Sequence, residues 1–452
     1  MKIKTSALLI ALATLASCAQ NQQSTKQCTL KTEASDSILT KYTKLTYTNH
    51  IYYDTAVMIC NEIDNGVFDY PTLTAAPKGY KPFYISHYGR HGSRYHWGQR
   101  EYQWWAATLD SAKNEGMLNE QGLKIANELA LINADAKLRA GDLSAAGRTQ
   151  HQGIAQRMMK NFPQVFEGPN AYIDAKSTVV TRCILSMDAF CQELKAKYPT
   201  LTISNDCGLC FQYYLLHEPD RNPYRDSAEW RAQSFKFYGS LSRELPAKRL
   251  FIDAEAAAKR FNLHRIASGI YNAAGIGQGV FVDGVSEIFN FFTPAELIDQ
   301  YKSSNFYWYT NYSCAPQLGG LKNVKNAQYL ANKIIEEADA VINGTSNLRA
   351  NLRFGHDNGL MPLLALLGVN KAGEQIDDLS QLANKWTTAR YVPMAANMQI
   401  IFYRSSNAND DILVKILQNE NEAQLPIDGN FPYYKWNDVK AFWLQQIETA
   451  NK

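Results

Sequence analysis

The sequence lacks an excess of charge of either sign, because 46 Lys and Arg residues face 43 Asp and Glu residues. No global field therefore draws the chain to nucleic acid or to an anionic membrane, and a preference for an anion must come from a local cluster. Internal repeats and low-complexity arrays are also missing. The 452 residues are 46% hydrophobic and 20% charged, which excludes a collagen, a long coiled coil and a mostly disordered chain.

Three common arrangements for phosphate, acyl and metal chemistry are absent as well. The sequence has no Gly-x-x-x-x-Gly-Lys-Ser/Thr phosphate loop and no Gly-x-Ser-x-Gly nucleophile elbow. No second close pair of Cys or His residues completes a tetrahedral zinc set. We therefore expect neither a metal nor another cofactor, and no nucleic-acid partner.

No apolar run is long enough to span a membrane, and the run at residues 7–16 follows Lys2 and Lys4. Ten residues are too few to cross a bilayer, which needs about 20, so this run is typical of a signal peptide. It ends in Leu15-Ala16-Ser17-Cys18, which resembles a bacterial lipobox; the alternative is an ordinary cleavage site with a chance cysteine. The resemblance implies a signal peptide over 1–17, a polar tether over 18–30, and a lipid on Cys18 that anchors the chain extracytoplasmically, on the periplasmic face or the cell surface.

Cysteines are few, and seven remain once Cys18 is set aside, so at least one is unpaired within the chain. Cys207-Gly-Leu-Cys210 has the spacing of a redox pair. It follows Asn205-Asp206, however, and lacks the strand-then-helix pattern of a thioredoxin-type site. We expect a local disulfide, or two separate structural partners, instead.

Three segments share one pattern: a short apolar strand, a turn with Gly or Ser and basic residues, and an amphipathic helix. The expected strands are 82–86, 171–175 and 351–354, the turns are 87–94, 176–178 and 355–359, and the helices are 99–115, from about 180, and 360–367. Such units predict an α/β sheet flanked by helices. Because ligands bind beyond the carboxyl ends of the strands in such sheets, the three turns are expected to meet in one crevice.

Residues 205–318 follow a different pattern, with helical windows such as 254–261 and 294–302 and a dense group of aromatic side chains. We expect a mainly α-helical cap over 205–318, inserted into an α/β catalytic domain made of residues 31–204 and 319–452.

The three turns, together with the start of the helix that follows the second one, carry the candidate site residues Arg90, His91, Arg94, Arg182, His356 and Asp357. Three guanidinium groups that converge on one point repel one another unless an anion of high charge density lies between them. A guanidinium can donate two parallel hydrogen bonds to the oxygens of a phosphate group, so phosphate is such an anion. The N-termini of the following helices add positive potential. A neutral His91 can attack phosphorus if its other nitrogen is held by an acceptor, and a protonated Asp357 can supply the leaving oxygen with a proton.

Other interpretations of these residues remain open. His87 and His91 have the spacing of a helical metal pair, although Gly89 and Gly92 disfavour a helix there. Arg90 and Arg94 could each be solvated surface charges. His356-Asp357 could be a turn whose aspartate caps the next helix.

The segment Arg90-His91-Gly92-Ser93-Arg94, together with the distal His356-Asp357, resembles the histidine acid phosphatases. The similarity extends over most of the chain after the leader, through Ser177-Thr178, Arg182-Cys183, Ser186, Ala189-Phe190, Leu143-Ser144, Gly147 and Gln150. Within that group the chain is most similar to multiple inositol polyphosphate phosphatases, through Phe83–Ser86, Tyr88–Tyr95, Phe354–His356 before Pro362-Leu363, and Tyr391–Pro393 with Ala396-Asn397.

This resemblance implies a phosphoglycerate-mutase-like α/β fold with a helical cap. It implies that His91 becomes phosphohistidine, that Arg90, Arg94, Arg182 and His356 bind the phosphate, that Asp357 donates the proton, and that no metal takes part. The expected activity is phosphomonoester hydrolysis, with inositol polyphosphates such as phytate as substrate. The alternatives are a sugar phosphatase resembling glucose-1-phosphatases, a broad-specificity acid phosphatase, and a lipoprotein that only binds phosphate esters.

Two positions depart from the family pattern. His96 stands where many histidine acid phosphatases have Pro, and His356-Asp357-Asn358 stands where multiple inositol polyphosphate phosphatases usually have His-Ala-Glu. The acid is therefore expected at Asp357, as in bacterial phytases and glucose-1-phosphatases. These departures affect substrate choice rather than the type of reaction.

Overall fold

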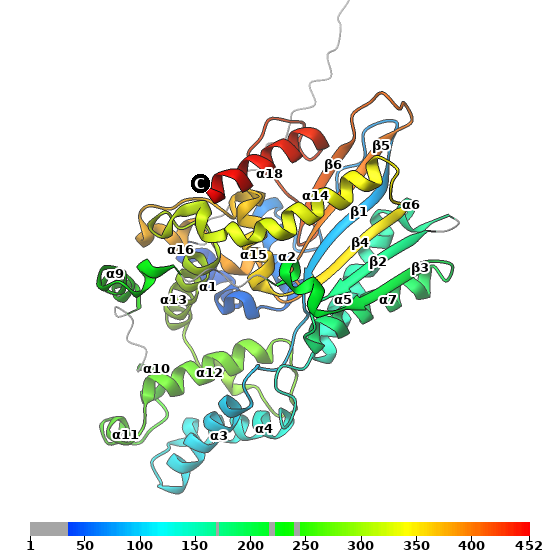
Figure 1. Cartoon of the computed structure of the whole chain (residues 1–452). Helices are drawn as coiled ribbons and strands as arrows, with labels where there is room; N and C mark the ends of the chain where they lie inside the picture. The colour runs from blue at the N-terminus through cyan, green and yellow to red at the C-terminus, as the bar shows by residue number, and fades with distance from the viewer. Residues whose placement is uncertain (1–34, 169–170, 217–221, 239–244) are drawn as a thin grey trace, which may run out of the picture.

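The computed structural model describes residues 35–168, 171–216, 222–238 and 245–452 (Figure 1). The predicted signal peptide and tether, including Cys18, lie outside these residues. No helix in the described ranges combines the length and apolar character needed to cross a membrane.

A mixed eight-stranded sheet lies at the centre of the molecule (Figure 1). Its strands are β1 (Tyr80–Arg90), β2 (Tyr172–Ser177), β3 (Thr202–Cys207), β4 (Leu348–Gly355), β5 (Asn397–Ser405), β6 (Leu413–Gln418), β7 (Asn421–Glu422) and β8 (Tyr434–Lys435). Their order is β3-β2-β4-β1-β5-β6-β7, with β8 beside β6. The first four are mutually parallel and β5 begins the antiparallel half, so the predicted α/β fold is confirmed.

Side chains of β1 alternate between two hydrophobic cores. Tyr84 and Tyr88 belong to the core on one face of the sheet, and Ile85 to the core on the other. The first face is covered by α8 (Gln212–Leu215), α13 (Pro294–Tyr312), α14 (Gln328–Ile342), α15 (Asp357–Leu366) and α18 (Trp436–Asn451). The second face is covered by α2 (Tyr53–Asn65), α5 (Ala145–Asn161), α6 (Pro163–Phe166) and α7 (Thr181–Lys197).

A third core belongs to helices that lie beside the sheet, below it in Figure 1. These are α3 (Gln99–Asn114), α4 (Glu120–Asp135), α10 (Leu245–Lys248), α11 (Ala254–Arg260), α12 (Leu263–Gly277) and η4 (Glu287–Asn290). Helices α3 and α12 approach closely, since a Cβ on Gly269 would lie 2.7 Å from Trp105 Cδ1.

The hydrophobic packing crosses the predicted boundaries of the cap. Helices α3 and α4 precede residue 205, yet their apolar faces are buried in the same core as α12. Trp230 and Phe306, which lie inside 205–318, are instead buried in the large core that covers the first face of the sheet. Which helices share a core depends on which apolar faces pack together. Helical periodicity shows that a helix has an apolar face, but it does not show which other element that face packs against.

The first part of the described chain, before β1, packs against α13. It contains α1 (Asp36–Lys41) and the 3₁₀ helix η1 (Thr43–His50), which share a small core with Ile298 and Tyr301. The remaining helical segments are η2 (Leu209–Phe211), η3 (Pro223–Asp226), α9 (Ala228–Tyr238), η5 (Pro316–Leu318), η6 (Gly320–Ala327), η7 (Val369–Lys371), η8 (Leu379–Gln381), α16 (Leu382–Lys385) and α17 (Thr388–Tyr391).

Two local predictions are wrong. The first expected turn was placed at 87–94, but β1 continues to Arg90 because the backbone there still pairs with Gly355 of β4. A local disulfide between Cys207 and Cys210, or a separate structural partner for each, was expected, but both are exposed and free, and the other four described cysteines are also free. Cys207 also ends a strand and Cys210 lies in the short helix that follows, contrary to the pattern read from the sequence.

Candidate active site

The carboxyl ends of three parallel strands lie side by side at one edge of the sheet. Arg90 of β1 is paired with Gly355 of β4, and Phe354 is paired with Ser177 of β2. The residues that follow these strands therefore emerge together. The structure brings all six predicted site residues to this edge.

His91 directly follows β1 and is held through its backbone on both sides. Its N–H donates to Gly355 O at 2.9 Å, and its carbonyl accepts from the Ala395 N–H at 3.0 Å. The ring atom Nδ1 lies 2.9 Å from Gly92 O, so Nδ1 carries the hydrogen and donates it. Nε2 is then the nitrogen with a free lone pair, as a nucleophile requires.

The surroundings of His91 keep its imidazole neutral. Burial lowers its pKa, and the charges of Arg182, Arg90 and Arg94 lower it further, to well below the usual value of 6.5. The ring of His356 lies edge-on to it, with centroids 5.5 Å apart. The lone pair on Nε2 is therefore available at neutral and moderately acidic pH.

The guanidinium groups come from three different segments and are largely buried. Arg90 has no exposed surface, and its Nη1 donates to Asn49 O at 2.5 Å and to Val392 O at 2.7 Å. Arg94 is 8% exposed, and its Nη1 donates to Tyr95 O. Arg182 lies in the first turn of α7. The suggestion that Arg90 and Arg94 are solvated surface charges is therefore wrong.

Buried donors of these arginines remain without acceptors. The Nε–H groups of Arg90, Arg94 and Arg182 have no hydrogen-bond partner among the described residues. Buried polar groups are normally satisfied, and buried cationic donors are best satisfied by an anion. The arrangement is therefore suited to the oxygens of a phosphate group.

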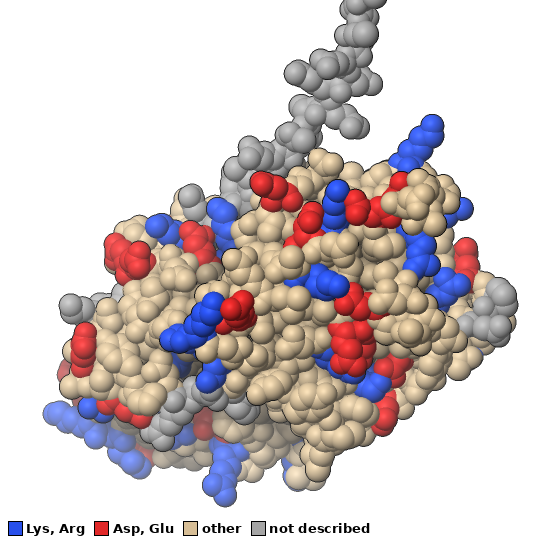
Figure 2. All heavy atoms as spheres, turned by 45° about the horizontal axis from the view of Figure 1, so that its top comes forward, with Lys and Arg blue, Asp and Glu red and all other residues tan. Residues whose placement is uncertain are grey.

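This cationic charge lies inside the molecule rather than on a broad surface patch. On the face drawn in Figure 2, Lys and Arg side chains are interspersed with Asp and Glu. The local cluster of cationic groups expected for a chain of nearly balanced charge is the one at this edge of the sheet, where Arg90 and Arg94 are buried.

His356 and Asp357 begin helix α15. His356 is the N-cap residue and Asp357 the first helical residue, so the aspartate is not the cap. His356 Nε2 lies 3.2 Å from Thr178 Oγ1, and its Nδ1 lies 3.5 Å from Arg182 Nη2. Burial and the charge of Arg182 lower the pKa of His356 to about 4, so it offers the site a neutral imidazole.

Asp357 forms an ion pair with Arg90, and 2.7 Å separates Oδ2 from Nη2. Burial by itself raises the pKa of this carboxyl, but Arg90 and the amide of Asn49 outweigh that effect and bring the pKa to about 2. The free protein therefore holds an aspartate anion at this point.

The start of α5 supports the loop that follows β1. A Cβ on Gly92 would lie 2.3 Å from Gly147 O, so the loop and the helix can touch only because both positions are glycine. Gln150 Oε1 accepts from the Ser93 N–H at 2.8 Å, and Ser186 Oγ accepts from the Gly92 N–H at 3.2 Å. These contacts give Gly147, Gln150 and Ser186 structural roles beneath the site.

Two residues of the site were not identified from the sequence. Asn49 Nδ2 donates to Asp357 Oδ2 at 3.0 Å across 308 positions of the chain. His50 lies near the same charges, and burial together with Arg94 and Arg90 lowers its pKa to about 3. Neither residue belongs to a motif or an apolar pattern, so no sequence signal indicated them.

His87, the other member of the suggested metal pair, lies inside β1 rather than on a helix. Its ring is buried against Phe190 and Phe354, with centroids 5.4 and 5.3 Å away. The helical metal pair is therefore wrong. Among the described residues no group of three or more His, Cys, Asp or Glu side chains could hold a metal ion.

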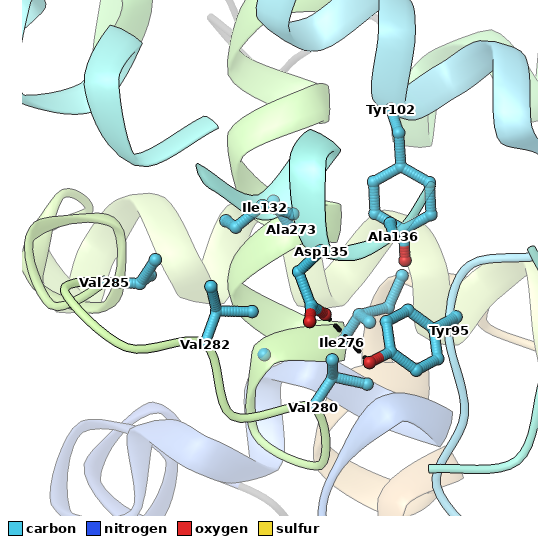
Figure 3. A pocket seen from close by; sticks show the side chains of 11 residues that line it. Tyr95, Tyr102, Ile132, Asp135, Ala136, Ala273, Ile276, Val280, Val282 and Val285 are labelled. Carbon is cyan, nitrogen blue, oxygen red and sulfur yellow. Dashed lines mark hydrogen bonds between the residues drawn. The ribbon is translucent and has the colours of Figure 1, made fainter. Parts of the chain in front are cut away.

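A small cavity within the helical region is separate from this edge of the sheet. Figure 3 shows that its lining consists mostly of apolar side chains from α4, α12 and the loop after α12. At its edge the Tyr95 hydroxyl donates a hydrogen bond to Asp135 Oδ2 at 2.8 Å. Its volume of about 10 Å³ is barely that of one water molecule. It is a packing gap between helices and has no room for a phosphate ester.

Known proteins share both the sequence pattern and the fold. A model of the histidine phosphatase superfamily (branch 2) matches residues 268–419, which include His356 and Asp357. Multiple inositol polyphosphate phosphatase 1 of Gallus gallus is 22% identical over 338 residues, covering 68% of this chain and 70% of that protein.

Solved structures are similar over almost their whole length. The multiple inositol polyphosphate phosphatase of Bifidobacterium longum in complex with inositol hexasulfate has a TM-score of 0.68 and 17% identity, covering 88% of this chain and 97% of that one. The phytase from D. castellii has a TM-score of 0.60 and 12% identity, covering 91% of this chain and 88% of that one. The family match, the curated relative and the shared fold agree with the motif residues at the sheet edge: residues 268–419 match the histidine phosphatase superfamily (branch 2), and the chain as a whole has the fold of these phosphatases.

Proposed function

We propose that this protein hydrolyses phosphomonoesters of inositol polyphosphates, phytate among them, through a phosphohistidine at His91. The observation that carries the proposal is a neutral histidine, held by its Nδ1, among three guanidiniums whose buried Nε–H groups have no acceptor among the described residues. The substrate class is supported by the curated relative and by the B. longum phosphatase with bound inositol hexasulfate.

In the first half of the reaction, Nε2 of His91 forms a bond to phosphorus while the bond from phosphorus to the bridging oxygen breaks. Arg90, Arg94 and Arg182 bind the nonbridging oxygens, where negative charge is concentrated. The bridging oxygen takes a proton from Asp357 and leaves as an alcohol. In the second half, the Asp357 carboxylate accepts a proton from the water whose oxygen bonds to phosphorus; the bond from phosphorus to His91 Nε2 breaks, its electron pair returns to Nε2, and inorganic phosphate is released.

The low pKa of Asp357 determines when the acid acquires its proton. With a pKa of about 2 the free protein carries the anion over most of the pH range. A bound phosphate group offsets the guanidinium charge that depresses this pKa, and the pKa then rises. Substrate binding is therefore expected to be coupled to uptake of a proton at Asp357.

We also propose that the protein acts outside the cytoplasm, anchored by a lipid on Cys18. The support is the short apolar run followed by Leu15-Ala16-Ser17-Cys18.

Phosphate release from inositol hexakisphosphate, glucose 1-phosphate and p-nitrophenyl phosphate tests the activity and the substrate class together. Wild-type protein quenched during turnover should carry acid-labile phosphate on His91. The His91→Ala variant should bind phosphate esters but lose turnover by more than about 10³-fold, because the nucleophile is gone. Turnover within tenfold of the wild type would contradict the nucleophile, and binding without any wild-type turnover would favour the phosphate-binding lipoprotein.

A further inference from the structure

We propose that Asn49 is a positioning residue for the proton donor: its amide occupies Oδ2 of Asp357, so that the carboxyl carries and delivers its proton on Oδ1. The inference rests on the proposed hydrolysis and adds a residue from the segment before the sheet. It concerns the atom that holds the proton, which the family motif does not specify.

The two carboxylate oxygens of Asp357 have different surroundings. Oδ2 lies 2.7 Å from Arg90 Nη2 and accepts from Asn49 Nδ2 at 3.0 Å. Oδ1 accepts from the backbone N–H of Asn358 at 3.0 Å. Each carboxylate oxygen has about two lone-pair sites. On Oδ2 the Asn49 amide occupies one site, and the Arg90 cation lies against the oxygen in an ion pair without hydrogen-bond geometry, whereas one site of Oδ1 remains. A proton on Oδ2 would point at a cation or at an N–H group, whereas Oδ1 can hold it.

The assignment balances the first chemical step. As His91 Nε2 bonds to phosphorus, the electron pair of the breaking bond passes to the bridging oxygen, which takes the proton from Oδ1. Asp357 is left as a carboxylate, and its new charge is stabilised by the amide and the cation already beside Oδ2. Without the amide of Asn49, Oδ2 would have a free site and the proton would be shared between the two oxygens.

Asn49 is held so that it serves the acid and the phosphate-binding arginine together. Asn49 is 8% exposed. Its backbone carbonyl accepts from Arg90 Nη1 at 2.5 Å, and its side-chain amide donates to Asp357. One residue therefore fixes both partners of the ion pair.

The backbone before Asn49 supports this view. Thr48 has φ 52° and ψ −117°, although its neighbours belong to a 3₁₀ helix. A positive φ is unusual for a β-branched residue, and such conformations persist where the surroundings enforce them. Thr48 Oγ1 lies 3.1 Å from Ser304 Oγ on α13, and Tyr271 of α12 donates to Thr46 O at 2.7 Å. These contacts hold a turn that directs Asn49 towards the site.

The other groups around Asp357 do not obscure a test by pH. The titratable and charged groups that act on it from neighbouring elements are Arg90, Arg94, His50, His356, Tyr88 and Cys183. The arginines keep their charge, the pKa values of His50 and His356 are about 3 and about 4, and burial raises those of Tyr88 and Cys183. Between about pH 4.5 and 8, a change at Asn49 therefore alters the titration of Asp357 alone.

The test compares the pH profiles of kcat for inositol hexakisphosphate and p-nitrophenyl phosphate over this pH range in Asn49→Ala and Asn49→Asp, because kcat reports the pKa of Asp357 in the substrate complex, where the bound phosphate has raised it. Loss of a donor to the carboxylate raises this pKa further, so the basic limb of the kcat profile should move up by about 0.5 to 1 unit in Asn49→Ala. Activity on the hexakisphosphate should fall about tenfold, because its alkoxide needs the proton, and activity on the nitrophenyl ester less than about threefold. Asn49→Asp keeps the shape of the side chain and places a second carboxyl beside the first, so the limb should move further.

Asn61→Ala is the matched control. Asn61 is also buried in the segment before β1, and its amide donates to Val67 O and Asp69 O, far from Asp357. This variant should lower thermal stability and leave the pH profile in place. Equal losses of activity on both substrates, with the basic limb of the pH profile unchanged, would overturn the proposal. If Asn49→Ala does not fold, the same measurements on Asn49→Asp decide the test. Absence of phosphohistidine in the wild-type protein would instead contradict the proposed function, so the two failures are distinguishable.

Discussion

Asp357 illustrates, at the scale of one residue, how its neighbours set the chemistry of a carboxyl. Burial raises the pKa, Arg90 and Asn49 lower it, and the balance in the free protein favours the anion. Asp357 can therefore act as an acid only when the negative charge of a bound substrate offsets the arginines and raises the pKa of the carboxyl. The same contacts that depress the pKa also stabilise the carboxylate left after proton transfer.

Asp357→Asn should therefore affect substrates in proportion to their need for a proton. General acid catalysis is worth about 10²–10⁴ in rate, and an inositol alkoxide leaves very poorly without it. We expect most of that factor to be lost on inositol hexakisphosphate, and less than about tenfold on p-nitrophenyl phosphate, which leaves almost unaided. The measurement is the ratio of kcat/KM for the two substrates, in which errors in active concentration cancel. Equal losses would mean that the proton comes from another group.

At the scale of an element, the first turn of α5 holds the loop between His91 and Arg94. A Cβ on Gly147 would lie 2.2 Å from Ser93 O and 2.8 Å from Ser93 N, which are backbone atoms that cannot rotate away. The loop and the helix must therefore separate to accept any side chain at that position.

Gly147→Ala should cost about 1–3 kcal/mol of stability through overpacking and lower kcat/KM at least tenfold, because the loop shifts. The matched control is Gly153→Ala on the same helix, where the nearest atoms to the new methyl belong to the side chain of Arg157, at 3.0 Å, and not to the backbone of the loop. That control should change stability by less than about 1 kcal/mol, because the gain in helix propensity is offset by a shift of an Arg157 guanidinium held by Glu420, and it should keep its activity. Urea unfolding and kcat/KM of both variants check the prediction, and similar behaviour of the two would show that the contact is unimportant.

At the scale of the whole molecule, buried histidines make the fold sensitive to acid. His87 lies between the sheet and α7, 1% exposed, and burial, His151 and Arg353 lower its pKa to about 3. An unfolded chain binds a proton at this histidine near pH 6.5, whereas the folded chain does not until about pH 3. Between these values the unfolded state holds more protons, so stability falls as the pH falls.

His87→Leu should remove this part of the acid sensitivity. Relative to the wild type, the variant should gain about 1–3 kcal/mol of unfolding free energy when the pH is lowered from about 7 to about 4.5. Urea unfolding at both pH values, followed by tryptophan fluorescence, measures the difference. A variant that loses as much stability as the wild type over this interval would contradict a neutral, buried His87.

The proposed anchor also concerns the whole molecule. Cys18→Ser should move the protein from the membrane fraction to a soluble or unprocessed form without changing its specific activity, because the six candidate site residues lie between 90 and 357 and the serine alters none of them. A single acyl chain anchors only weakly, so stable fractionation of the wild type would indicate more than one. Membrane fractionation with mass spectrometry of the mature N-terminus checks this. Wild-type protein free in the medium with an unmodified Cys18 would contradict the anchor.

The sequence by itself determined the parts of this protein that depend on neighbouring residues. The strand, turn and helix around His91, Arg182 and His356 follow local patterns, and strands of this kind place their following turns at one edge of a sheet. The α/β fold and the six candidate site residues were therefore predictable before any contact was known.

Only the tertiary structure decided what approaches those residues from a distance. Asn49 reaches Asp357 across 308 positions, and α3 and α4 share a core with α12 although the chain between them passes through the sheet. Such contacts depend on which buried faces meet and on where a strained turn points a side chain. Neither leaves a periodic pattern in the sequence, because many residues can occupy such positions until the packing around them is defined.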